Sequence, residues 1–296
     1  MTADERIANA GLLSLPLPSA VFFDTHALRF YIPLIMKPAY LAKHALTAVL
    51  DIVLPNHCLA CEEALTGEHF LCDFCRDQLS FIEGSRCEEC GKPVGEYSAR
   101  EQRCAECKRH PLQFSQASAP LRYSTVTRDL LLKLKFERKP LIASYFAVFL
   151  AEHFARLYWL AKVDLIVPAP MHWFKHVARS YNQAALLASN MASQFGVPVS
   201  NSLKKTRHTQ PQVRLARSDR LKNIAGSIEV KKPDAVKDKT VLLVDDVMTT
   251  GTTCSECARV LYEAGAEEVF VLTVARALMR NPSAALPALP DTVQDK

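Results

Sequence analysis

The sequence predicts an α/β protein, in which a parallel sheet carries helices on both faces and is preceded by a small cysteine-rich module. Two observations lead to this fold class. From residue 163 onward, short apolar runs typical of buried strands alternate with longer segments of helical periodicity, as in parallel sheets. Ahead of them, eight of the ten cysteines lie between residues 58 and 107, in four C-x-x-C pairs.

The composition narrows the class of protein. A chain of 296 residues with 49% apolar content suits one large or two smaller globular domains, and no apolar run reaches transmembrane length. Asp4 and Glu5 are unfavourable in the basic start of a signal peptide. We therefore expect a cytoplasmic protein whose cysteines bind metal rather than form disulfides. The net charge of +5 permits contact with a polyanion without requiring it.

Residues 1–35 and 281–296, at the two ends of the chain, show little helical or strand periodicity. We expect the natural start at Met36, with residues 1–35 disordered or an over-extended start. The apolar spacing of residues 36–57 predicts an amphipathic helix that leads into the cysteine region. Residues 281–296 are expected to form a flexible tail.

The cysteine module, residues 58–110, has the spacing of zinc knuckles. Ten residues separate the first two pairs and thirteen separate the last two. Two knuckles complete one tetrahedral site, so we expect two structural zinc ions. The spacing leaves open whether consecutive or crossed pairs share an ion, and a redox dithiol or an iron–sulfur cluster are the competing interpretations. The eight candidate ligands are Cys58, Cys61, Cys72, Cys75, Cys87, Cys90, Cys104 and Cys107.

The charge of this module argues against a nucleic-acid surface. Between Cys58 and Cys107 there are eleven acidic residues and five Lys or Arg, a formal charge of −6. Phosphate contact requires basic side chains. We therefore expect a structural or partner-docking module.

The second domain, residues 114–280, supplies the predicted sheet. Apolar runs predict strands at 121–123, 163–167, 241–244 and 269–274, with an edge element at 197–199. Helical spacing predicts helices at 127–134, 144–160, 181–195 and 254–263. Gly265 is expected to cap the last helix, and Asn182 with Gln183 to cap or anchor the helix at 181–195.

The stretch from residue 241 to 253 predicts a sugar-phosphate site. Asp245 and Asp246 stand where the strand is expected to end, and a hydroxyl-rich loop and a helix start follow. The N–H groups of a first helical turn and the helix dipole favour an anion, while paired acids suit sugar hydroxyls or a divalent cation. The loop residues are Thr249, Thr250, Gly251, Thr252 and Thr253.

Two other sites also place acids after a strand. The magnesium site of a nucleotide triphosphatase needs a G-x-x-x-x-G-K-[ST] loop, which none of the nine glycines begins. A phospho-acceptor site would not need the threonine loop directly after the acids. A further pair, Cys254 and Cys257, follows this loop, and we interpret it as packing of small residues against the sheet.

A basic arc lies between Met171 and Ile224, with nine Lys or Arg and one acid, Asp219. Such a run is most often a solvated face. This one follows the strand at 163–167 and includes a long irregular segment, Thr206–Leu221, of the kind that forms binding loops. The arginine fork suits phosphate oxygens. The candidate phosphate ligands, for which the resemblance described next implies pyrophosphate, are Lys175, Arg179, Arg207, Arg217 and Arg220.

These motifs together resemble a known family. The stretch 241–253 resembles the phosphoribosyl-pyrophosphate (PRPP) motif of type I phosphoribosyltransferases, and most of residues 50–277 resembles the ComF family of competence-associated proteins. The family usually has glycine where this chain has Ser180, and the surrounding Arg179, Asn182 and Gln183 agree with it. The other matching segments are the cysteine pairs, residues 134–136, 167–170 and 179–183, Thr209, Gln212, Arg217, Arg220, Asn223, and residues 275–276.

The resemblance implies a type I phosphoribosyltransferase-like domain behind a double zinc ribbon, PRPP binding and a role in DNA uptake. It implies that Asp245 and Asp246 hold the ribose hydroxyls and that the threonine loop holds the 5′-phosphate. In a transferase, Mg²⁺ would bridge the diphosphate, and the acids would stabilise positive charge at the anomeric carbon. It does not establish that transfer occurs.

Two non-catalytic alternatives stay open. In one, the same pocket binds PRPP or a 5′-phosphate while the basic arc follows single-stranded DNA. In the other, a zinc-stabilised scaffold docks a helicase or translocase through its acidic ribbon.

Overall fold

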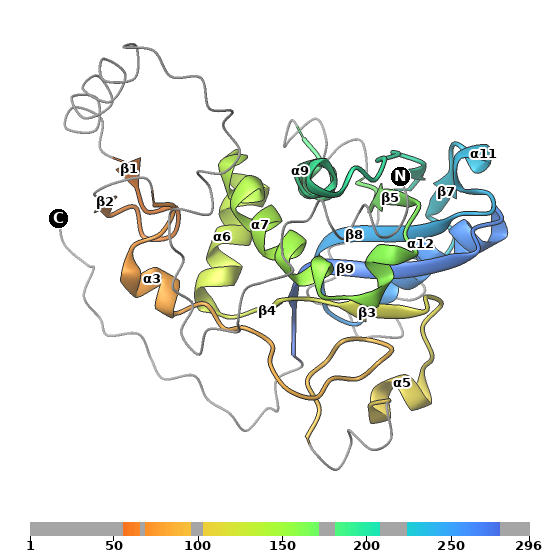
Figure 1. Ribbon diagram of the computed structural model, residues 1–296, viewed down its shortest axis with the longest axis horizontal. Coiled ribbons are helices and arrows are strands. Elements are labelled where there is room, and N and C mark those ends of the chain that lie inside the picture. The colour runs from red at the N-terminus through yellow and green to blue at the C-terminus, as the bar shows by residue number, and fades with distance from the viewer. Residues whose placement is uncertain (1–55, 66–68, 96–102, 172–180, 208–223, 279–296) are drawn as a thin grey trace.

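The computed structural model describes residues 56–65, 69–95, 103–171, 181–207 and 224–278 (Figure 1). Its strands are β1 (Asn56–His57), β2 (Ala64–Leu65), β3 (Gln116–Ser118), β4 (Leu121–Arg122), β5 (Leu165–Pro168), β6 (Leu203–Lys205), β7 (Ile228–Val230), β8 (Thr240–Met248) and β9 (Glu268–Arg276). Its helices are α3 (Asp73–Asp77), α5 (Ala105–Arg109), α6 (Thr125–Phe136), α7 (Leu141–Ala155), α9 (Gln183–Phe195), α11 (Pro233–Val236) and α12 (Thr252–Glu263), with a 3₁₀ turn at Tyr158–Ala161. The predicted segments 1–35 and 281–296 lie outside these residues, as does the predicted helix 36–57 except for its last two residues, Asn56 and His57, which form strand β1 instead.

A parallel sheet of five strands forms the centre of the molecule. Its order is β3-β9-β8-β5, and β4 also pairs with β9. All of these pairs are parallel. Parallel sheets require crossover connections, which place helices on the faces.

The side-chain alternation of the strands divides the core into two layers. Ile166, Leu242 and Phe270 pack with α7 and α9, while Val167, Leu243 and Val271 pack with α12 on the opposite face. Successive residues of a strand point to opposite faces, so one apolar run serves both layers. The predicted fold class, with helices on both faces, is therefore confirmed.

The two halves of the cysteine module lie apart. The first half, with β1, β2 and α3, lies against α6 and α7, and the second half, with α5, lies near β3 (Figure 1). The two halves therefore belong to different core layers. Within the described ranges, no helix is both long enough and apolar enough to cross a membrane.

Three predicted elements differ from the structure. Strand β8 continues through both acids to Met248, because its pairing with β9 continues there, with Asp245 opposite Thr273 and Met248 opposite Arg276. The predicted helix 144–160 ends at Ala155, where Leu157 is extended and Trp159 then stacks on Phe270 with ring centroids 4.7 Å apart. The apolar pattern continues across this break, so the sequence does not reveal it.

The third difference concerns short strands. The predicted edge element at 197–199 is a single bridge from Val199 to Ile166. The sequence analysis missed β3, as well as the antiparallel pair β6 and β7. These strands have three residues each, which is too short for a periodic signal.

Candidate functional site

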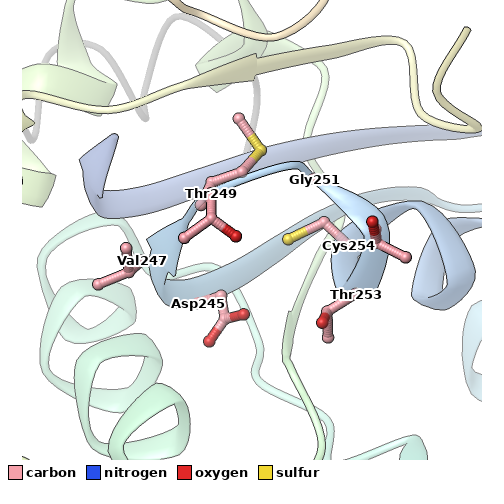
Figure 2. A pocket seen from close by; sticks show the side chains of 8 residues that line it. Asp245, Val247, Thr249, Gly251, Thr253 and Cys254 are labelled. Carbon is pink, nitrogen blue, oxygen red and sulfur yellow. The ribbon is translucent and has the colours of Figure 1, made fainter. Parts of the chain in front are cut away.

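The end of β8, the following turn and the start of α12 form a small pocket (Figure 2). Its volume is about 40 Å³. Pockets for whole small-molecule ligands are typically larger than roughly 300 Å³, so this one has room for a small chemical group only. Its lining is Asp245, Val247, Met248, Thr249, Gly251, Thr252, Thr253 and Cys254.

Gly251 makes the sharp turn between strand and helix possible. Its φ of +79° lies in the left-handed region, and it is the residue that caps the start of α12. A Cβ at this position would lie 3.2 Å from Cδ1 of Leu112, so the space is also limited. Next to it, the hydroxyls of Thr250 and Thr252 lie 2.8 Å apart. The threonine loop is thus the helix N-terminus, where N–H groups and the dipole favour an anion.

The two acids lie side by side in β8 and differ in environment. The backbone N–H of Asp246 donates to Oδ1 of Asp245 at 2.8 Å. Burial, and then the neighbouring charge of Asp246, raise the pKa of Asp245 to about 7. Figure 2 shows the Asp245 carboxylate on the same side of the strand–helix turn as the Thr253 side chain. The pocket therefore offers the Asp245 carboxylate as an acceptor next to hydroxyl and amide donors, and Asp246 is not among the residues that line it.

Lys135, which the sequence analysis did not select as a site residue, reaches this acid pair. Its Nζ lies 2.7 Å from Oδ2 of Asp246. Burial opposes its charge and is the largest single effect, but the contacts with Asp246 and the charge of Asp245 together outweigh it and raise the pKa of Lys135. Tyr181 donates to the carbonyl of Leu134 at 2.6 Å and so holds the end of α6 at the site. The sequence did point to Lys135, because this residue lies in the segment 134–136, which matches the family.

Of the five predicted pyrophosphate ligands, Arg207 lies within the described residues. Lys175, Arg179, Arg217 and Arg220 lie outside the described residues. Arg207 is exposed, and its Nη2 donates to the carbonyl of Ala225 at 2.6 Å. Gly226 donates to Oε1 of Glu256 at 2.7 Å. Arg207 therefore joins the two ends of the segment between β6 and β7, and it is not among the residues that line the pocket.

Asn182 takes its predicted role at the start of α9. Asn182 caps the helix by accepting from the N–H of Ala184 at 3.1 Å. Its amide also donates to the carbonyl of Ala169 at 2.9 Å, which ties the helix to the residue after β5. Gln183 is the first helical residue and is 3% exposed. The structure thus confirms the capping role for Asn182, whereas Gln183 is buried at the start of α9 and its Nε2 atom has no hydrogen-bond partner among the described residues.

The predicted packing role of Cys254 and Cys257 is confirmed. Both thiols are buried in α12, and burial, followed by the nearby charge of Asp245, raises their pKa well above the usual value. A protonated, buried thiol is a poor nucleophile and a poor metal ligand. This C-x-x-C pair is therefore part of the core.

The eight other thiols form two tetrads of consecutive pairs, which answers the open question of pairing. The first tetrad is Cys58, Cys61, Cys72 and Cys75, and the second is Cys87, Cys90, Cys104 and Cys107. Within each, the sulfur atoms lie within 4.8 Å of one another, and none of them forms a disulfide. Backbone N–H groups of Cys72 and Cys104 donate to Cys58 at 3.4 Å and to Cys87 at 3.3 Å. This donor set fits structural zinc.

Arg276 connects the second tetrad to the pocket. It is 3% exposed, its Nε donates to the carbonyl of Cys90 at 3.1 Å, and its Nη1 donates to the carbonyl of Met248 at 2.9 Å and to that of Thr249. The sequence analysis used residues 275–276 only as a family match. A buried guanidinium with four main-chain acceptors, the fourth being the carbonyl of Ala277, could not be inferred from residue order.

Two family descriptions match the chain. Residues 49–108 match the double zinc ribbon domain, and residues 182–288 match the phosphoribosyl transferase domain. The cysteine module is thus a double zinc ribbon, and the parallel sheet belongs to a phosphoribosyltransferase-type domain.

Curated relatives match most of the chain. Competence protein F of Haemophilus influenzae is 30% identical over 227 residues, which cover 74% of this chain and 96% of that protein. A DNA utilization protein of Salmonella typhi is 29% identical over 232 residues, 77% of this chain and 100% of that protein. A competence protein of Bacillus subtilis is 26% identical over 207 residues, 68% of this chain and 81% of that protein.

Proposed function

Because the chain belongs to the competence protein F family, we propose that it binds PRPP with a divalent cation at the β8–α12 turn and acts in the uptake and handling of DNA. The observation that carries the proposal is the pocket itself. It brings Asp245, a glycine-dependent turn and a helix N-terminus together in one small pocket, and Asp246 follows Asp245 in the same strand, outside the pocket lining. The names of the curated relatives support the link to DNA.

Each part of the pocket has a separate task in this proposal. The turn at Thr249–Thr253 binds the 5′-phosphate through N–H groups and hydroxyls. Asp245 and Asp246 accept hydrogen bonds from the ribose hydroxyls. When bound, Mg²⁺ supplies positive charge that neutralises the diphosphate. The volume of about 40 Å³ suits the phosphate alone, so the ribose and diphosphate lie outside this pocket.

Lys135 and Asp246 form an ion pair at the position that the ribose would occupy. Ligand binding must therefore replace or extend the 2.7 Å contact between them. Lys135 is well placed to turn toward a phosphate oxygen once the sugar engages Asp246. We include it among the ligand-binding residues on this ground.

The family relation also motivates the proposed partners and location. Competence and DNA utilization are the processes for which the relatives are named. We propose single-stranded DNA and a DNA-uptake helicase or translocase as partners, and the cytoplasm, where thiols stay reduced, as the location. Transfer of the phosphoribosyl group to an acceptor is a further step that binding alone does not require.

Calorimetric titration of the purified protein with PRPP and Mg²⁺ tests the site. The double substitution Asp245→Asn with Asp246→Asn preserves side-chain size and removes both charges. Charge-assisted hydrogen bonds contribute about 1.5–3 kcal/mol each, so we expect affinity to fall by at least about 10-fold. Glu263→Gln, which removes an exposed acid at the other end of α12, is the control and should bind normally. Absence of binding to the unaltered protein, or full binding by the double variant, would contradict the proposal.

A further inference from the structure

Arg276 is a buried cation whose hydrogen-bond partners are all main-chain oxygens in the part of the chain that is described. These are the carbonyls of Cys90, Met248, Thr249 and Ala277. Carbonyl dipoles satisfy the N–H groups but supply only partial charge. A desolvated guanidinium is stabilised most by a full negative charge nearby.

The second tetrad can supply that charge. Four thiolates around one Zn²⁺ carry a formal charge of −2, and Arg276 contacts the backbone of the ligand Cys90 at 3.1 Å. All four of these cysteines are buried, so water screens the attraction little. The zinc-filled tetrad and the guanidinium therefore stabilise each other.

On its other side, Arg276 fixes the direction of the peptide groups that begin the phosphate turn. In a trans peptide, the carbonyl of one residue and the N–H of the next point in opposite directions. Because the carbonyls of Met248 and Thr249 point to Arg276, the N–H groups of Thr249 and Thr250 point away from it. Holding two carbonyls thus orients two donors in the turn that lines the pocket.

Two neighbouring contacts strengthen the same connection. The side chain of Leu112 lies against Gly251, and its backbone N–H donates to Oε1 of Glu89 at 2.6 Å. The backbone N–H of Gln113 donates to the hydroxyl of Ser255 in α12 at 3.0 Å. Gly251 and Ser255 are therefore contacted by Leu112 and Gln113, which follow the second ribbon in the chain, and Leu112 is tied to that ribbon through Glu89.

We propose that Arg276 is a positioning residue that couples occupancy of the second zinc site to the order of the phosphate-binding turn. Loss of zinc from the second tetrad then releases the turn and weakens ligand binding, whereas loss from the first tetrad leaves the turn intact. The ligand-binding consequence rests on the proposed function. The ordering of the turn does not.

Hydrogen exchange followed by mass spectrometry, without ligand, tests this coupling directly. We expect exchange in a peptide covering residues 248–253 to be at least about 10-fold faster in Arg276→Gln and in Cys90→Ser than in the unaltered protein. Arg276→Lys keeps the charge but has a single donor group, and should show an intermediate rate. The controls are Arg259→Gln, which removes a cation that pairs within α12, and Cys61→Ser in the first tetrad.

The following outcomes decide the proposal. Normal exchange in Arg276→Gln would overturn it, as would equal acceleration by Cys61→Ser and Cys90→Ser. If Cys90→Ser does not fold, the exchange rates of Arg276→Gln and Arg276→Lys decide the proposal. Metal analysis must then show that these two variants keep the zinc content of the unaltered protein. PRPP affinity should fall at least about 10-fold in Arg276→Gln. If the unaltered protein binds no PRPP, the proposed function fails, while the exchange rates still judge the coupling.

Discussion

The two cysteine tetrads have identical ligands but different surroundings, and the comparison shows which one serves the pocket. In the first, Cys61 is exposed and Cys72 half-buried, and the ribbon packs on α6 and α7. In the second, all four cysteines are buried in the core layer that contains α12. The first tetrad therefore lies on the outside of the sheet domain, away from the pocket. The second tetrad lies in the same core layer as the helix that begins at the pocket.

Different chemistry joins each ribbon to the sheet domain. The first ribbon relies on buried aliphatic side chains such as Leu71 and Leu79, on aromatic contacts such as Phe70 with Tyr145 at 5.5 Å, and on exposed ion pairs of Glu62. The second relies on the buried contacts of Arg276 and on Gly91, where an added Cβ would lie 2.6 Å from the carbonyl oxygen of Ala117. Exposed pairs tolerate change better than buried backbone contacts do.

The largest difference is expected on loss of one ligand from each tetrad. Structural zinc sites contribute about 10–16 kcal/mol of binding free energy at pH 7, and a buried site offers no water as a substitute ligand. Cys90→Ser should therefore lower the thermal midpoint by more than about 10 °C, and Cys61→Ser by clearly less. Calorimetric unfolding with zinc analysis measures both. Equal losses would remove the distinction between the tetrads.

A matched pair of glycines isolates the close contact of the second ribbon. Gly91 and Gly84 both have positive φ, +65° and +71°, but a Cβ at Gly84 would meet nothing within 4 Å. Gly84→Ala should cost about 1 kcal/mol from backbone strain. Gly91→Ala adds a collision with backbone and should cost about 2 kcal/mol more. Urea unfolding compares them, and similar costs would show that the second ribbon does not press closely on β3.

The acid in the pocket, Asp245, makes the stability of the protein depend on pH. The raised pKa of Asp245, about 7, means that the folded protein holds a proton that the unfolded chain releases near pH 4. The wild type therefore loses stability as the pH rises from about 4 through 7. Asp245→Asn avoids this loss and should be more stable by roughly 1–3 kcal/mol at pH 8, without ligand or Mg²⁺, and equally stable at pH 4. Denaturant unfolding at both pH values measures this, and a pH-independent difference would contradict it.

The smallest effect is expected at the first ribbon. Hydrogen bonds from Lys133 and Lys139, and then their charges, lower the pKa of Glu62 to about 2, but Glu62 is exposed. Glu62→Gln should change the thermal midpoint by no more than about 2 °C, and a salt concentration of about 0.5 M should remove the difference. A larger, salt-independent change would mean that the first ribbon is held more firmly than we infer.

The sequence predicted those features that a local pattern determines. The cysteine pairs, the acids before a threonine loop, and the strand and helix around them are local, and their positions followed from periodicity and residue type. The end of β8 was wrong by four residues because pairing with β9 continues past the apolar run. Propensity gives no information on such pairing.

Contacts between distant segments were not predictable in this way. Which cysteine pairs share an ion, how Lys135 reaches Asp246, and why Arg276 is buried all depend on how segments far apart in sequence pack. None of these contacts can be inferred before the fold is known. Arg276 and Lys135 nevertheless stood in segments that matched the family, so the resemblance located them without giving their roles.

A crystal structure of the protein soaked with PRPP and Mg²⁺ tests the central claim most directly. We predict the 5′-phosphate at the N–H groups and hydroxyls of residues 249–253, and the ribose hydroxyls on Asp245 and Asp246, with the contact between Lys135 and Asp246 replaced or extended. A phosphate bound elsewhere, or a pocket that stays empty at saturating PRPP while Lys135 keeps its contact with Asp246, would contradict the account.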